Sequence, residues 1–155
     1  MIPVGAYGYP ETHFQYDFGA QRKVSGSVAL EHGAFYNGTR TSLSTSRGRV
    51  EITPQIIVEP GLTIDWVDLP EGHFVNKLVS ARTSYALTPR MSTSALVQYN
   101  SSLSSLDTSL RFRWEYRPGS DFFIVYTDNR DSALTRFPTL RNRALVVKLT
   151  RLFRM

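Results

Sequence analysis

The segment from Leu110 to Arg117 constrains the fold more than any other part of the chain. Its even positions hold Leu, Phe, Trp and Tyr, and its odd positions hold Arg, Arg, Glu and Arg. Successive side chains of a β-strand point to opposite faces, so a strand here has one apolar face and one ionic face. A helix would mix the two sets around its surface. The apolar face would meet a core in a soluble sandwich, and lipid in an outer-membrane barrel.

Composition narrows the class of protein. A chain of 155 residues suits one domain. No segment approaches the roughly 20 consecutive apolar residues of a membrane helix, which excludes a helical membrane protein. The 18 basic and 13 acidic residues give a net charge of +5. Many of the basic residues alternate within expected strands and form no run, so we expect no nucleic-acid partner. The chain has no cysteine, which excludes disulfides and thiolate metal sites.

The alternation pattern predicts a single all-β domain over residues 1–155, with residues 1–20 as a poorly defined lead-in. We expect about eight long strands in an antiparallel up-and-down meander, either a transmembrane β-barrel or the C-terminal arc of a larger one. Asn37-Gly38 predicts a two-residue hairpin turn, and Pro60-Gly61 predicts a bulge. A further strand at Thr12–Phe18 is a weaker prediction. The main strands are expected at about 24–36, 39–53, 55–67, 74–88, 92–99, 110–117, 121–127 and 144–153.

Three features favour lipid outside the apolar face. Connections alternate between short turns and longer loops, at 128–143, 100–105 and 68–72, as in outer-membrane barrels. The terminal strand has an alternating apolar face, which Arg151 interrupts. Aromatic residues lie near expected strand ends, where interfacial girdles belong: Tyr36, Trp66, Tyr85, Tyr99, Tyr116 and Phe153. The residues predicted to face lipid are Ile56, Ile64, Val97, Phe112, Trp114 and Leu149.

The opposite phase of the same strands carries charge. These residues are predicted to line the barrel interior: Arg47, Arg49, Glu51, Arg82, Arg111, Arg113, Glu115 and Lys148. Two interpretations remain open. The charges form an ion-paired ladder that fixes strand register, or they form a basic lumen that favours anionic solutes.

No catalytic motif accompanies this pattern. His13, His32 and His73 share no metal-ligand spacing, and no Gly-x-Ser-x-Gly elbow is present. Asp65 and Asp68 are compatible with a glycosidase-like carboxylate pair, although solvated loop acids explain them better. We therefore predict a protein that is not an enzyme, with no catalytic residue, cofactor or metal.

From Gly33 onward the chain resembles the C-terminal part of a bacterial family. The residues that carry the resemblance lie in 33–38, 67–74, 97–101, 111–126 and 146–154, and the strongest run is Arg111 to Asp121. Members of this family join an N-terminal domain similar to family-9 carbohydrate-binding domains to a C-terminal domain of unknown function, expected to be an outer-membrane barrel. The resemblance implies a Gram-negative outer-membrane location and a chain that is a fragment of a longer parent. It implies lipid and the barrel-assembly machinery as partners, and carbohydrate only through the missing N-terminal domain.

The sequence thus predicts an outer-membrane β-barrel segment that acts as a membrane anchor or solute pore, linked to carbohydrate handling in the parent protein. The alternative is a soluble β-barrel or sandwich that binds a small apolar ligand. The two hypotheses place the same side chains in opposite environments. Val97, Phe112 and Trp114 lie outside the barrel in the first and inside it in the second.

Overall fold

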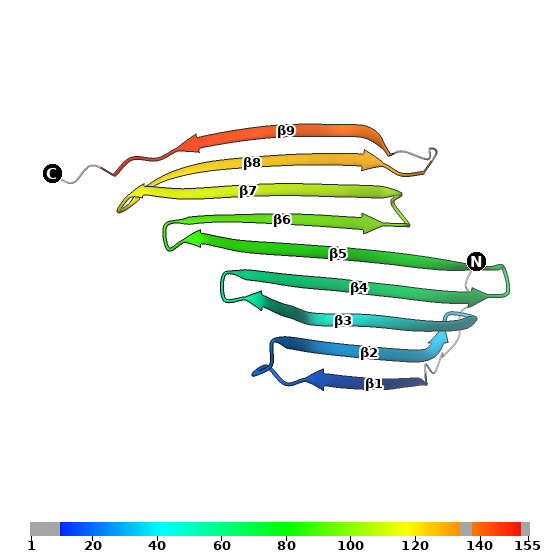
Figure 1. Ribbon diagram of the computed structural model, residues 1–155. Coiled ribbons are helices and arrows are strands. Elements are labelled where there is room, and N and C mark those ends of the chain that lie inside the picture. Colours follow the sequence, from blue (N-terminus) through cyan, green and yellow to red (C-terminus); the bar gives the residue numbers. More distant parts are fainter. Residues whose placement is uncertain (1–9, 134–137, 153–155) are drawn as a thin grey trace.

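The computed structural model describes residues 10–133 and 138–152, which form nine β-strands in one layer (Figure 1). The strands are β1 (Glu11–Phe18), β2 (Val24–Phe35), β3 (Gly38–Thr53), β4 (Ile56–Leu69), β5 (Gly72–Thr88), β6 (Met91–Asn100), β7 (Ser105–Arg117), β8 (Ser120–Asp131) and β9 (Thr139–Leu149). No helix in this part of the chain is long and apolar enough to cross a membrane.

Every strand pairs antiparallel with its neighbours in the sequence, so the sheet order is β1 to β9. This confirms the predicted all-β, antiparallel up-and-down meander. The weaker strand prediction at Thr12–Phe18 corresponds to β1, so the second half of the expected lead-in belongs to the sheet. Within the described residues β1 pairs only with β2, and β9 pairs only with β8. The two edge strands therefore lie at opposite borders of the sheet (Figure 1).

The turns gather at two ends of the sheet, which we call end A and end B. End A carries the connections 19–23, 54–55, 89–90 and 118–119, and end B carries 36–37, 70–71, 101–104 and 132–138. The predicted alternation of loop length holds in the C-terminal half only. The expected loop at 68–72 was wrong, because Asp68 and Leu69 pair with His73 and Gly72. The expected loop at 128–143 was also too long, because strand pairing extends to Asp131 and resumes at Thr139.

The hairpin turn between β2 and β3 differs from its prediction by one residue. Phe35 pairs with Gly38, so the two turn residues are Tyr36 and Asn37, and Tyr36 has the positive φ of 54°. Gly38 is the first residue of β3, where a Cβ atom would clash with the carbonyl oxygen of Asp68. Glycine is needed there for close approach of two strands and not for the turn itself.

A column of irregular backbone crosses β2, β3 and β4. Pro60 cannot donate a ladder hydrogen bond, and the register between β3 and β4 breaks opposite it, between Ser44 and Val50. Arg47 has φ 52° in this break, and a Cβ at Gly48 would lie 2.5 Å from the carbonyl oxygen of Pro60. Proline therefore does mark a bulge, but the extra residue lies in β3 and not in β4.

Gly26 continues this column into β2, and it provides a test of the packing. Its φ is 134°, and an added Cβ would lie 2.8 Å from the Cα of Gly48. We expect Gly26→Ala to lower the free energy of unfolding by about 1–3 kcal/mol, the usual cost of a non-glycine residue in such a conformation. Gly19→Ala is the control, because nothing lies within 4 Å of a Cβ there. Urea titration measures both, and equal stability of the two variants would contradict the close approach of the backbone at Gly26.

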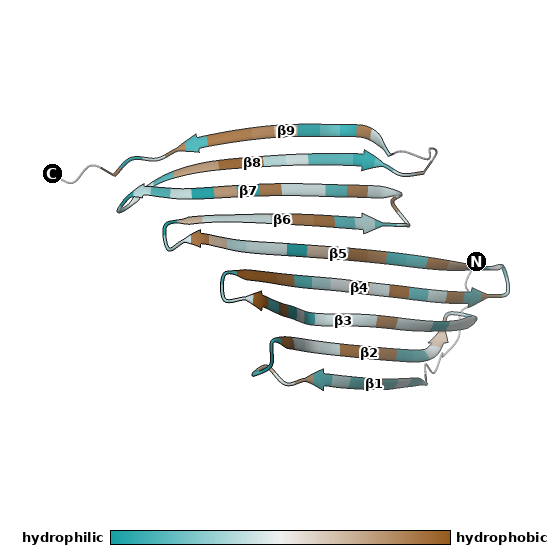
Figure 2. Ribbon diagram, viewed as in Figure 1, coloured by the Kyte–Doolittle hydropathy of each residue, from teal (hydrophilic) through white to brown (hydrophobic). Residues whose placement is uncertain are grey.

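The register sorts the side chains into two faces. One row runs across six strands through Ile56, Tyr85, Thr93, Phe112, Ile124 and Val147, and we call its side of the sheet the apolar face. The next row runs through Glu51, Ile57, Ser84, Ser94, Arg111, Val125 and Val146, and its side is the polar face. Figure 2 shows that β8 and β9 are apolar toward end A and hydrophilic toward end B.

A single layer leaves both faces open. Val67 is the only buried hydrophobic residue in the described part of the chain. The accessible surface is 11719 Å², whereas a folded monomer of 17.6 kDa exposes about 7,900 Å². The sheet therefore lacks the core that stabilises a water-soluble domain of this length, and its stability requires another medium or partner against the apolar face.

Candidate functional site

The structure brings together nearly all the residues that the sequence predicts for the charged interior. Cross-strand pairing links Ser92, Arg113, Phe123 and Lys148 in one row of the polar face, and Glu115 pairs with Asp121 on the same side. Arg49 and Arg82 lie on this face as well, opposite Ser25 and Glu59. Arg47 is the exception: it occupies the β3 bulge, where the register does not fix its side.

The six residues predicted to face lipid also share one side. Ile56 and Phe112 belong to the row that defines the apolar face, and Trp114 pairs with Phe122, which pairs with Leu149. Val97 pairs with Ala81, and Ile64 pairs with Leu43 on the same face. The structure thus fixes which residues share this face.

The predicted ion-paired ladder forms only in part. The Nε of Arg113 donates to Asp121 at 3.1 Å, and Arg49 lies 4.0 Å from Glu51. Glu115 accepts a hydrogen bond from the backbone N–H of Gly119 and closes the turn after β7. Three cations of the polar face have no ion pair among the described residues: Arg82, Arg111 and Lys148. Arg82 lies opposite Glu59, whereas Arg111 and Lys148, toward end A, have no acidic residue opposite them in the neighbouring strands.

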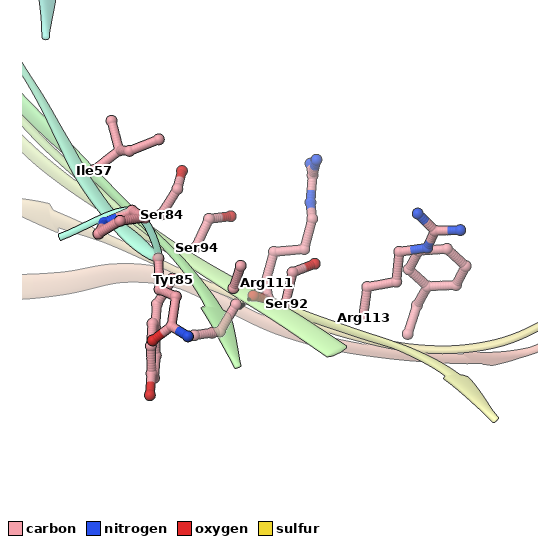
Figure 3. Close-up of a pocket in the computed structure, with 12 residues that line it drawn as sticks. Ile57, Ser84, Tyr85, Ser92, Ser94, Arg111 and Arg113 are labelled. Carbon is pink, nitrogen blue, oxygen red and sulfur yellow. Dashed lines mark hydrogen bonds between the residues drawn. The ribbon is translucent and has the colours of Figure 1, made fainter. Parts of the chain in front are cut away.

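Arg111 stands beside a hollow of about 410 Å³ on the polar side of β5, β6 and β7. Hydroxyl groups of Ser84, Ser92 and Ser94 line it. Their side chains project from the sheet on the same side as Arg111 and Arg113 (Figure 3). Tyr85 also borders the hollow but projects to the other side (Figure 3). Arg113 lies at its end A margin, with its guanidinium 5.8 Å from the ring centre of Phe123.

This arrangement suits a bound or passing anion. A guanidinium offers five N–H donors and keeps its charge at all physiological pH values, and serine hydroxyls add neutral donors. Val125 and Val146 continue the row of Arg111. Apolar neighbours reduce local hydration, which strengthens the attraction between a cation and a solute anion.

End B of the polar face has the opposite character. Asp107 accepts hydrogen bonds from Ser105 and Asn129, and Asp131 forms an ion pair with Arg141 at 2.9 Å. Asp65 lies on the same face and accepts a hydrogen bond from Asn76. Carboxylates and amides thus replace the free cations found near end A. The polar face has a gradient of charge along the strands.

The apolar face ends in a charged cluster toward end B, which sequence reasoning missed. Asp128 is 5% exposed and receives hydrogen bonds from Arg130 at 2.5 Å, Arg143 at 3.0 Å and the hydroxyl of Tyr126 at 3.1 Å. Asp128 and Arg130 continue the phase of Phe122, Ile124 and Tyr126 along β8. The change from apolar to charged residues at these alternate positions is the sequence signal that could have revealed the cluster.

The predicted aromatic residues divide between the two ends. Trp66 and Tyr99 lie near end B on the apolar face, and Tyr36 forms the turn there. Tyr85 and Tyr116 lie near end A, where the hydroxyl of Tyr116 donates to the carbonyl oxygen of Thr150. Phe153 lies outside the described residues.

The histidines and the acidic pair do not form a catalytic group. His13 contacts Glu31 and His32 contacts Thr41, in two different faces of the β1–β3 region. Asp65 pairs with Asn76 and Asp68 pairs with His73, so the two carboxylates lie on opposite faces of β4. The hypothesis that they form a glycosidase-like pair was therefore wrong. In the described ranges no group of three or more histidine or acidic residues could hold a metal ion.

No protein-family model matches this chain, and no curated protein or solved structure matches it either. The resemblance to the bacterial barrel family stays a prediction.

Proposed function

We propose that this chain is a β-barrel segment of a bacterial outer-membrane protein, which anchors its parent in the membrane and presents a polar interior to solutes. One observation carries the proposal: nine strands place apolar side chains on one face of a single-layer sheet that has no core. Lipid against the apolar face supplies the missing apolar environment. The polar face, rich in serine and charge, then lines the interior.

The dimensions support this assignment. The apolar phase of β4 runs from Ile56 to Trp66, which is ten steps of about 3.3 Å, or about 33 Å along the strand. At a tilt of about 40°, this span corresponds to about 25 Å along the membrane normal, the usual height of the apolar band of such barrels. On β8 the apolar run is shorter and stops at Tyr126, where the Asp128 cluster begins.

The polar face supports a role in passing anions. Arg111 and Lys148 form no ion pair and face no acidic residue across the strands in the part of the chain that the structure describes, so their charge remains available to a solute. Basic residues along a pore wall favour anionic solutes. This favours the basic-lumen hypothesis over a fully paired ladder.

Closure is part of the proposal. Backbone N–H and C=O groups cannot remain unpaired in hydrocarbon, so β1 and β9 must pair with each other or with further strands. The proposed partners are outer-membrane lipid and the barrel-assembly machinery. A link to carbohydrate through an N-terminal domain of the parent is supported only by the resemblance of residues such as those from Arg111 to Asp121.

Two measurements test the proposal. Fractionation of expressing cells is expected to place the protein in the outer membrane, and the folded protein in detergent is expected to migrate differently on a gel before and after boiling. A folded barrel keeps its shape in cold detergent, whereas boiling unfolds it. A protein that unfolds cooperatively in plain buffer, with no heat-dependent shift in detergent, would instead support the soluble alternative with an apolar ligand.

A further inference from the structure

A second hollow lies on the apolar face near end A, outside the polar interior. Its volume is about 490 Å³, and it is lined by Trp114, Tyr116, Arg117, Phe122, Leu149 and Arg151. Trp114, Phe122 and Leu149 are paired across β7, β8 and β9 and form an apolar floor. Trp114 meets Tyr116 edge to face, with ring centres 6.1 Å apart.

Local backbone features place two arginines at the end A margin of this floor. The register shifts between Glu115 and Arg117, so Tyr116 has no partner in β8. Successive side chains of a regular strand cannot line one hollow, but a bulge allows Tyr116 and Arg117 to do so. Arg151 follows β9 in a segment held by paired backbone hydrogen bonds between Asp121 and Thr150 and by the N–H of Leu152 to Ser120.

We infer that this hollow binds an anionic glycerophospholipid of the membrane leaflet at end A. Along the strand direction the site changes from an apolar floor to two guanidiniums, which is the order of acyl chain and phosphate in a lipid. A guanidinium pair can hold a phosphate diester through several charge-assisted hydrogen bonds. The inference rests on the proposed function, since it requires lipid against the apolar face.

The two tryptophans of the chain provide the test. Trp114 belongs to the hollow, and Trp66 lies on the same face near end B, where its strand partners are Thr41 and Val75. The chain is placed in vesicles that contain phosphatidylglycerol and phosphatidylcholine, with bromine on the acyl chains of one lipid at a time. Trp66→Phe and Trp114→Phe variants leave one fluorescent tryptophan each.

We expect brominated phosphatidylglycerol to quench Trp114 more than brominated phosphatidylcholine does. Each arginine near the headgroups favours the anionic lipid by about fivefold. Trp66 is expected to be quenched equally by the two lipids. Arg117→Gln combined with Arg151→Gln should abolish the preference at Trp114 while the quenching by phosphatidylcholine continues, and Arg22→Gln, in another turn of end A, should preserve the preference.

Equal quenching of Trp114 by the two lipids would overturn this inference and leave the proposed function intact. No quenching of either tryptophan would overturn both, because the apolar face would then not meet lipid. Loss of the preference on addition of inorganic phosphate would overturn the lipid assignment, because the arginines would then serve a free anion.

Discussion

Val147→Arg is expected to destabilise the protein in lipid vesicles by about 2–4 kcal/mol, the cost of arginine in the middle of the lipid face of a barrel. Val147 lies at the centre of the apolar run of β9, between Leu145 and Leu149, and pairs with Ile124. Arginine there would place a guanidinium in hydrocarbon with no acidic partner. The measurement is the free energy of unfolding by urea titration in vesicles.

Val146→Arg is the matched control, because Val146 and Val147 are both 57% exposed and differ only in the face they occupy. Val146 lies on the polar face, opposite Val125, where an added charge meets water. We expect its cost to be near zero. If the two variants lose equal stability, or if Val146→Arg loses more, the apolar face does not meet lipid.

The second large effect is expected from Arg111→Glu, measured as ion selectivity of the reconstituted protein in a bilayer under a salt gradient. An anion about 7 Å from a guanidinium in water gains about 0.6 kcal/mol, or about 2.7-fold. Reversal of the charge removes this attraction and adds an equal repulsion. Preference for anions should therefore fall about sevenfold.

Arg22→Glu controls for the change of net charge. Arg22 is exposed in the turn 19–23 at end A and does not line the hollow beside Arg111. This variant should leave selectivity unchanged. If both variants change selectivity equally, the effect would come from overall charge and not from the polar face. An unselective wild-type channel would contradict the anion preference.

The strands and their faces could be predicted because alternation is a local property. The pattern from Leu110 to Glu115 predicts which side chains share a face, and the register agrees with it. The pattern fails at Arg117, because the bulge after Glu115 lets Arg117 line the hollow beside Trp114 on the apolar face. The first half of β7 was missed, since Ser105 and Ser109 give little contrast between the faces. The polar ends of β8 and β9 were missed because they carry few apolar residues; there the ion pair between Asp128 and Arg143 joins the two strands.

The bulges, the hollow beside Trp114 and the unpaired cations of the polar face could not be predicted in the same way. The position of Arg47 depends on which residues of β3 lie opposite Pro60 in β4. The register between these two strands must therefore be known before the bulge can be placed. Arg117 and Arg151 line the same hollow only because β8 pairs with both β7 and β9. Sequence alternation likewise cannot tell whether Glu115 pairs with an arginine or, as the structure has it, closes a turn.

Each of the nine strands pairs only with its neighbours in the sequence, and this determines how the sheet can gain or lose width. No strand crosses over another, so a hairpin within the sheet contacts the remaining strands only through the outer edges of its own two strands. Gain or loss of a whole hairpin at a turn such as 89–90 would leave every other register unchanged. It would also keep each side chain on its face, because the strand direction is restored after two strands. In the proposed barrel, the circumference could thus vary in units of one hairpin while the thickness of the apolar band stays constant.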